Sequence, residues 1–177
     1  IGVIPNEDFS SYFPQYTFEE RENYFNPNLK FETHIVSLNE KKYRSTTRMG
    51  TLIIHPVPFV LGKFIRIFLR FFKTIWIVKK YRVDLVRTYN TLQYGLIAML
   101  AAKINRKPFV LSLHSDYDRA IRNSGKNYFC WHTLEKIVMK NATVVIGVSP
   151  YLVEYAKKHG ARDVVVIPNP VNLKPFL

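Results

Sequence analysis

Cysteine is almost absent from the sequence, which leaves neither an internal disulfide nor a cysteine metal cluster. Cys130 is the only cysteine among 177 residues, so an internal disulfide is excluded, and a lone thiol favours a reducing compartment. No H-E-x-x-H motif or other familiar metal-ligand spacing occurs. We therefore expect no metal site and no bound cofactor, and we expect a cytoplasmic location.

Glycine is also scarce, and none of the seven glycines forms a phosphate-binding loop. The absence of G-x-G-x-x-G and of a P-loop removes the main support for a dinucleotide oxidoreductase or an NTPase. Ser149 follows "IGV" and resembles the serine of a nucleophile elbow. Tyr151 stands where the second glycine would be, and Pro150 favours a simple helix cap.

Long uninterrupted apolar runs are missing as well. The first residues, "IGVIPNEDF", have neither a basic start nor a long apolar stretch, so we expect no signal peptide. The most apolar region, 59–78, is interrupted by Lys63, Arg66, Arg70 and Lys73. Central charges are costly in a bilayer, so we expect no transmembrane helix.

Acidic residues are absent from one long stretch of this basic chain. The formal net charge is +13, and no Asp or Glu occurs from Lys41 to Val83. Such a block predicts an anionic partner, for which nucleic acid, anionic lipid and a phosphorylated substrate are candidates. The alternative is a solvated basic face that aids solubility.

What is present is a regular alternation of strand and helix patterns. Apolar runs predict strands at 1–4, 31–38, 51–55, 83–89, 108–114, 143–148 and 164–167. Helical patterns cover 17–25, 58–81, 92–104, 128–141 and 150–159. The later strands are continuously apolar, as in parallel strands buried on both faces. We predict an α/β fold: a Rossmann-like, open, mostly parallel sheet with helices on both faces.

Ligands of such sheets bind at the carboxyl ends of the strands. The polar residues expected there are Pro5-Asn6, Asn90, His114-Ser115-Asp116, Ser149 and Asn169. The "LHSDYD" stretch is the best chemical candidate, because imidazole can donate to a sugar hydroxyl or phosphate oxygen and a carboxylate can accept from hydroxyls. A histidine satisfied at the surface, with no functional role, is the alternative.

The helix predicted over 58–81 has two possible environments. Lys63, Arg66, Arg70, Lys73 and Lys80 form one narrow stripe, while its aromatic and aliphatic residues spread over roughly 200° of the helix. One possibility is a helix buried on most sides, between the sheet and a neighbouring element. The other is a surface of Lys63, Arg66, Arg70, Lys73 and nearby aromatics that touches anionic membrane headgroups.

Two stretches resemble a known family. "VDLVRTYNTLQYGLIAMLAAKINRKPFVLSLHSDYD" and "NATVVIGVSPYLVEYAKKHGARDVVVIPNPVNLKPF" are similar to the amino-terminal half of glycosyltransferase family 4. The resemblance implies one half of a GT-B fold, in which a Pro-Asn-Gly-Val-Asp turn joins two Rossmann-like domains. Residues 1–170 would form the acceptor-side domain, and 171–177 would begin the linker to a donor-binding domain missing from this chain.

The resemblance also implies site residues. His114 matches the family histidine that faces the donor sugar, and Asn90, Tyr94 and Gly95 lie where members of the family shape the acceptor side. We expect Asp116 and Asn169, at the same strand ends, to contact substrate as well. The sequence departs from the family at "IPNEDFSSYF", which replaces a glycine-rich turn, and at Pro170 and Asn172 of the turn between domains.

The implied activity is transfer of a sugar, with retention at the anomeric carbon, from a nucleotide sugar to a sugar or lipid-linked acceptor. It is of the hexosyltransferase type and needs no metal, and the donor is held mainly by the missing half, so the chain alone should be inactive. One alternative is a non-catalytic module that binds anions or the inner face of a membrane. Binding of nucleic acid rests on charge alone, because no recognition motif occurs, and we expect none.

Overall fold

The computed structural model describes residues 32–37, 45–49, 52–57, 62–122 and 127–168. The strand predicted at 1–4 and the helix predicted at 17–25 lie outside these ranges, as do Pro5-Asn6, Asn169 and the expected linker. The described elements are seven strands and five helices in an α/β arrangement. The α/β class predicted from the sequence is confirmed.

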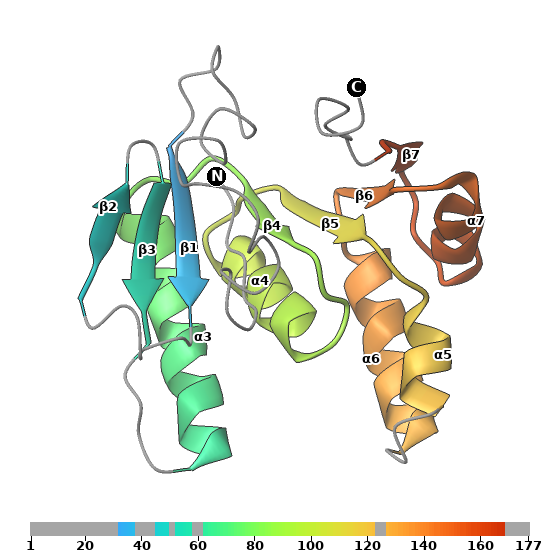
Figure 1. Ribbon diagram of the computed structural model, residues 1–177, viewed down its shortest axis with the longest axis horizontal. Helices are drawn as coiled ribbons and strands as arrows, with labels where there is room; N and C mark the ends of the chain where they lie inside the picture. Colours follow the sequence, from blue (N-terminus) through green and yellow to red (C-terminus); the bar gives the residue numbers. More distant parts are fainter. Residues whose placement is uncertain (1–31, 38–44, 50–51, 58–61, 123–126, 169–177) are drawn as a thin grey trace, which may run out of the picture.

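Four strands form a sheet in which every pair is parallel (Figure 1). They are β4 (Val86–Thr88), β5 (Phe109–Leu113), β6 (Val144–Gly147) and β7 (Val164–Val166), in that spatial order. The helices between them carry the chain back, as parallel strands require. Each of the four strands falls inside its predicted range. The continuous run of aliphatic residues around β5 suits a strand buried on both faces, whereas β7 is apolar but partly exposed.

The first three described strands form a sheet of their own, which the sequence did not predict. β1 (Thr33–Ser37) runs parallel to β3 (Leu52–Pro56), and β2 (Thr47–Met49) pairs with β3 in the antiparallel direction. The sequence predicted one open sheet, and β2 was not predicted at all. Its three residues, Thr-Arg-Met, are too few and too polar to give a strand pattern.

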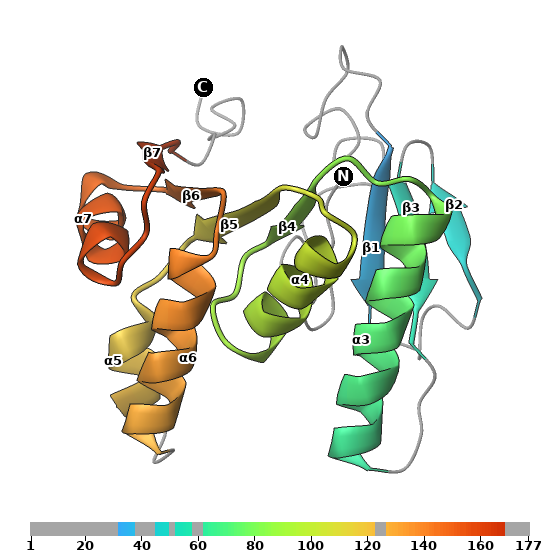
Figure 2. The same ribbon diagram turned by 180° about the vertical axis from the view of Figure 1, so that it is seen from behind.

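Helices α3 (Lys63–Lys80), α4 (Gln93–Ile104) and α6 (Tyr128–Lys140) lie in a row along the strands (Figures 1 and 2). α4 packs against α3, α6, β4 and β5, and α7 (Pro150–Lys158) packs against β6 and β7. The short α5 (Tyr117–Arg122) was not predicted. Among the described helices, none has both the length and the apolar character needed to cross a membrane.

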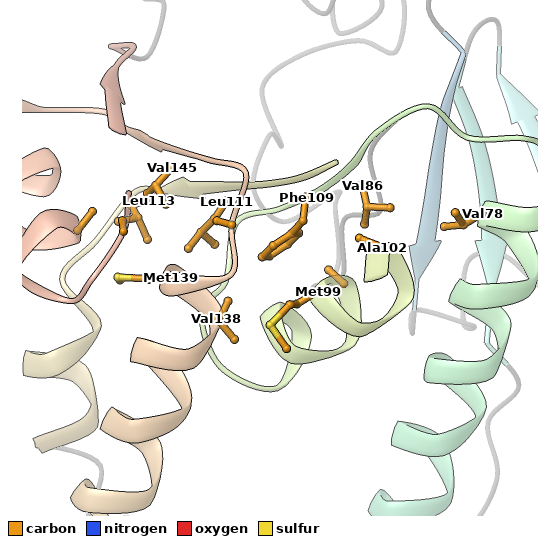
Figure 3. Close-up of a cluster of buried hydrophobic side chains, with 14 of the residues drawn as sticks. Val78, Val86, Met99, Ala102, Phe109, Leu111, Leu113, Val138, Met139 and Val145 are labelled. Carbon is orange, nitrogen blue, oxygen red and sulfur yellow. The ribbon is translucent and has the colours of Figure 1, made fainter. Parts of the chain in front are cut away.

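The core lies between the parallel sheet and the helices beside it. Figure 3 shows Val86, Phe109, Leu111 and Leu113 of the strands facing Met99 of α4 and Val138 of α6. Their side chains are almost fully removed from water. Burial of this kind is the main stabilising term of a domain this size.

The helix ends follow the cap signals of the sequence. Ser149 accepts a hydrogen bond from the Leu152 amide through its side chain, and Pro150 is the first residue of α7. Gly160 has φ 89°, the left-handed conformation expected just past a helix end. The helix predicted from Pro58 begins instead at Lys63, after Gly62 with φ 108°.

Candidate functional site

Polar side chains follow the carboxyl ends of β4, β5 and β6 at one edge of the parallel sheet. Asn90 comes two residues after β4, His114 directly after β5, and Ser149 two residues after β6. Because the three strands are neighbours and parallel, these residues lie along one rim, as the sequence indicated. The Ser149 side chain caps the first turn of α7, which agrees with a structural role.

His114 is exposed at the centre of this rim. Its ring meets the Tyr89 ring edge-on, with centroids 5.0 Å apart, and the Arg87 guanidinium lies over Tyr89 at 4.8 Å. The pKa of His114 is lowered, first by desolvation from surrounding atoms and second by the positive charge of Arg87. His114 is therefore neutral near pH 7, with one nitrogen that donates and one that accepts.

Arg87 and Tyr89 are rim residues that sequence reasoning missed. Arg87 lies in β4 and Tyr89 directly follows this strand, with the Tyr89 ring against His114. The Arg87 Nε donates a hydrogen bond to the Ser112 hydroxyl at 2.9 Å. This bond fixes a cation beside the exposed histidine. Their spacing could have identified them, because residues two positions apart on a strand point to the same face of the sheet.

Asp116 ties the rim loop to α7. Its carboxylate accepts a hydrogen bond from the Tyr151 hydroxyl at 2.6 Å, across 35 residues of chain. The loop that begins at His114 is thus held to the first turn of α7. Asp116 has a structural partner in addition to the substrate role expected of it.

Asn90, Tyr94 and Gly95 shape the start of α4. The Asn90 side-chain oxygen accepts from the Leu92 amide at 2.7 Å. A Cβ at Gly95 would lie 2.4 Å from the Asn90 carbonyl oxygen and 3.0 Å from a Val138 methyl, so only glycine allows this approach. The structure therefore gives Asn90 and Gly95 a packing role, and Tyr94 lies against Arg70 of the preceding helix, α3.

Arg70 of α3 lies against Tyr94 and does not belong to an exposed basic surface. Its guanidinium carbon is 4.2 Å from the centre of the Tyr94 ring, and the residue is 2% exposed. Burial lowers its pKa to about 10. Its Nε and one terminal nitrogen have no hydrogen-bond partner among the described residues. The prediction that Arg70 faces a membrane is wrong, because this side of α3 packs on the protein.

Lys73 and Arg66 of the predicted basic stripe also lie on the side of α3 that faces the protein. Lys73 is half-buried and donates to the Pro56 carbonyl at the end of β3, and Arg66 is half-buried. The side chain of Lys63 lies outside the described part of the chain. Charge periodicity showed correctly that these residues share a face, but it could not show whether that face meets water or protein.

The opposite side of α3 exposes aromatic residues. Phe64, Phe68, Phe72 and Trp76 recur every four residues, and each is more than half exposed. Lys79 and Lys80 are exposed at the end of the helix, where the Lys80 ammonium lies 4.4 Å from the centre of the Trp76 ring. The interpretation of α3 as a helix buried on most sides is therefore wrong.

Comparison with known proteins identifies the chain. The family model described as Glycosyltransferase Family 4 matches residues 27–174. The chain belongs to Glycosyltransferase Family 4. No curated protein matches its sequence.

Two solved structures resemble this Glycosyltransferase Family 4 chain. One is Glycyrrhiza uralensis UGT73P12 complexed with glycyrrhetinic acid 3-O-monoglucuronide, with a TM-score of 0.60 and 12% identity over 97% of this chain and 49% of that one. The other is the apo lipopolysaccharide outer core galactosyltransferase WaaB, with a TM-score of 0.61 and 15% identity over 97% of this chain and 46% of that one. The likeness confirms the GT-B type of fold. The chain spans about half the length of either structure.

Sequence patterns in the Family 4 chain also did not predict a second cluster of polar side chains. Asp118, His132, Glu135 and His159 come from α5, α6 and the end of α7, and meet between these helices. Burial raises the pKa of Glu135 to about 7, even though the Tyr155 hydroxyl donates to it at 2.8 Å. No short motif could have shown this group, because its members are spread over 42 positions, from 118 to 159.

Proposed function

We propose that this chain is the acceptor-side half of a retaining glycosyltransferase, which transfers a sugar from a nucleotide sugar to an acceptor. Membership of Glycosyltransferase Family 4 supports the proposed transferase activity, and the donor class and the retention are further parts of the proposal. The observation that carries the proposal is His114, exposed and kept neutral where β5 ends, with Arg87 fixed beside it.

In this proposal His114 is the residue that meets the donor sugar. A neutral imidazole can accept a hydrogen bond from a sugar hydroxyl, and this bond strengthens as positive charge develops at the anomeric carbon, because the hydroxyl then becomes a better donor. Arg87 adds positive potential beside His114, which would favour a donor that carries phosphate groups. Asp116 and Asn90 stand on the same rim and would meet the acceptor, as would Tyr94, Gly95 and Asn169.

In this proposal, a second domain that follows residues 171–177 would complete the donor-binding site. Stabilisation of the leaving diphosphate is the largest demand of the reaction, and one arginine beside a histidine meets only part of it. The second domain supplies the remaining cations and closes the cleft against water. A chain of residues 1–177 alone should therefore bind weakly and transfer nothing.

The test compares this chain with a protein extended by its second domain. Both are incubated with a panel of nucleotide sugars and with sugar and lipid-linked acceptors, and product is measured by mass spectrometry. We expect transfer with retained anomeric configuration from the extended protein only. Sustained transfer by the 177 residues alone would show that the donor site is complete without a second domain. Inactivity of both with every donor would favour the non-catalytic module.

We also propose that the protein works at the cytoplasmic face of an anionic membrane. The exposed aromatic side of α3, with Lys79 and Lys80 at its end, supports this second part. Aromatic rings favour the headgroup region of a bilayer, and nearby lysines are attracted to anionic lipid. A lipid-linked acceptor would be delivered to the rim from that surface.

A further inference from the structure

Four side chains of metal-binding type converge between α5, α6 and α7. Asp118 comes from α5, His132 and Glu135 lie one turn apart on α6, and His159 ends α7. One ligand atom from each residue lies within 4.8 Å of those from the other three. This group is separate from the rim residues to which the proposed sugar transfer assigns roles.

Two of the four side chains carry buried atoms that lack a hydrogen-bond partner among the described residues. They are the Glu135 Oε2 and the His159 Nε2. Glu135 is fully buried and His159 is 5% exposed. The nearest charged atom to the histidine nitrogen is the Asp118 Oδ2, at 3.8 Å, which is too far for a hydrogen bond. Leaving such atoms unpaired costs about 1–3 kcal/mol each, so a partner is expected at this place.

The tautomer of His159 is the one that a metal ligand needs. Its Nδ1 lies 2.8 Å from the Tyr155 carbonyl oxygen, which can only accept. Nδ1 therefore carries the proton, and Nε2 presents a lone pair to the group. Histidines that bind metals are commonly oriented in this way, by donating their other nitrogen to a backbone carbonyl.

Hydrogen bonds also hold the two carboxylates in place. The Glu135 Oε1 accepts from the hydroxyls of Tyr155 at 2.8 Å and Thr91 at 3.3 Å, which leaves Oε2 for another partner. The Asp118 Oδ1 lies 2.8 Å from the His132 Nδ1 and accepts from the Tyr128 hydroxyl at 3.0 Å. These hydrogen bonds hold the four side chains close to one another, so only small rotations separate them from a metal-binding arrangement.

We propose that Asp118, His132, Glu135 and His159 bind a divalent transition-metal ion such as Zn²⁺. Two imidazole nitrogens and two carboxylate oxygens form a set that suits Zn²⁺, and the two carboxylates balance its charge. Ligand atoms of tetrahedral Zn²⁺ lie roughly 3.3 Å apart, so small side-chain rotations would close the group around the ion. The ion would join three helices and stabilise the loop that carries His114.

The test is binding of Zn²⁺ to the protein after removal of metal with EDTA. Isothermal titration should show one Zn²⁺ per chain with micromolar or tighter affinity, and Tm should rise by about 5 °C at saturation. Co²⁺ in place of Zn²⁺ should give the visible absorption of a tetrahedral site. His159→Gln and His132→Gln should each weaken Zn²⁺ binding at least about tenfold.

The matched controls remove metal-binding side chains that lie outside the group. His114→Gln and Cys130→Ser should bind Zn²⁺ as the unchanged protein does. The proposal is overturned if saturable one-to-one binding is absent, or if the controls weaken it as much as the cluster variants. Glu135→Gln could unfold the protein because Glu135 is fully buried, but the side chain of His132 is 20% exposed and its variant decides the question.

Discussion

His114 combines two properties that rarely occur together, an exposed ring and a pKa below its usual value. For the protein extended by its proposed second domain, we expect His114→Ala to lower turnover by about 10²-fold, the size of losing one polar contact made in the transition state. The measurement is kcat with saturating donor. KM for the donor should change less, because the contact strengthens as the reaction proceeds.

The control for this prediction is Phe129→Ala, which removes a ring that is 77% exposed on α6. It should leave both kcat and the circular dichroism spectrum unchanged. Equal turnover of the unchanged enzyme and the His114 variant would mean that the histidine is an ordinary surface residue.

Individual residues differ in how far the sequence can place them. His114 was predictable, because a proline-led apolar strand must deliver its next polar residue to the rim. Gly95 was linked to the acceptor side, yet the close approach of the Asn90 carbonyl gives it a packing reason. The burial of Arg70 was not predictable, because it depends on Tyr94, which lies on another helix.

At the scale of elements, the exposed aromatic side of α3 can be tested with vesicles. The unchanged protein should sediment with anionic vesicles and not with neutral ones, and high salt should weaken the binding by screening Lys79 and Lys80. Changing Phe68, Phe72 and Trp76 to Ser should lower the partition coefficient at least about tenfold, since each ring contributes roughly 1 kcal/mol when half-buried in the interface.

Phe129→Ser is the matched control, because it removes an equally exposed ring from a different helix. Its binding to anionic vesicles should equal that of the unchanged protein. If the protein ignores anionic vesicles even at low salt, the membrane proposal fails and the aromatic side of α3 has another partner.

The sheet formed by β1 and β3 contains a buried histidine pair whose protonation should govern acid stability. The His34 Nδ1 lies 2.9 Å from the His55 Nε2, and both rings contact Tyr81. Burial, followed by the charge of His34, lowers the pKa of His55 to about 4. Burial is also the main cause that lowers the pKa of His34.

Both folded pKa values lie below the value near 6.5 of an unfolded histidine, so the unfolded chain takes up protons first. The contribution of the neutral histidine pair to the free energy of unfolding is fully present above about pH 6.5 and is lost as the pH falls toward 4. Between pH 7 and pH 4.5 the free energy of unfolding should fall by about 1–3 kcal/mol more than in His55→Gln, measured by urea denaturation. Parallel pH profiles of the two proteins would show that the pair does not titrate in this range.

Elements with one clear environment were the predictable ones. β5 is buried on both faces over most of its length and β6 is buried on one face and partly buried on the other, and their continuous apolar runs identified them. α3 carries aromatic residues on one side and cations on the other, and either side could have met the protein. The half-buried Lys73 decides the orientation through a carbonyl of β3, a contact that no local pattern reveals.

For the whole molecule, the comparisons give the extent of the likeness. The 177 residues cover about half of each similar structure, and the polar rim follows the carboxyl ends of β4, β5 and β6 in the parallel sheet. The order of elements predicted the sheet from β4 onward. The separate sheet of β1, β2 and β3 was not predictable, because the pairing of β2 with β3 depends on contacts and not on composition.

The outermost position of β7 has a consequence for how the chain behaves in concentrated solution. Among the described residues β7 pairs only with β6, and Val165, Val166 and Ile167 are all partly exposed. A strand edge of uncharged, β-branched residues is a template onto which another extended segment can add. Asp163 and Pro168, at its two ends, are the residues that limit such growth. This short edge is therefore one place on the described part of the chain where a second copy could add a strand.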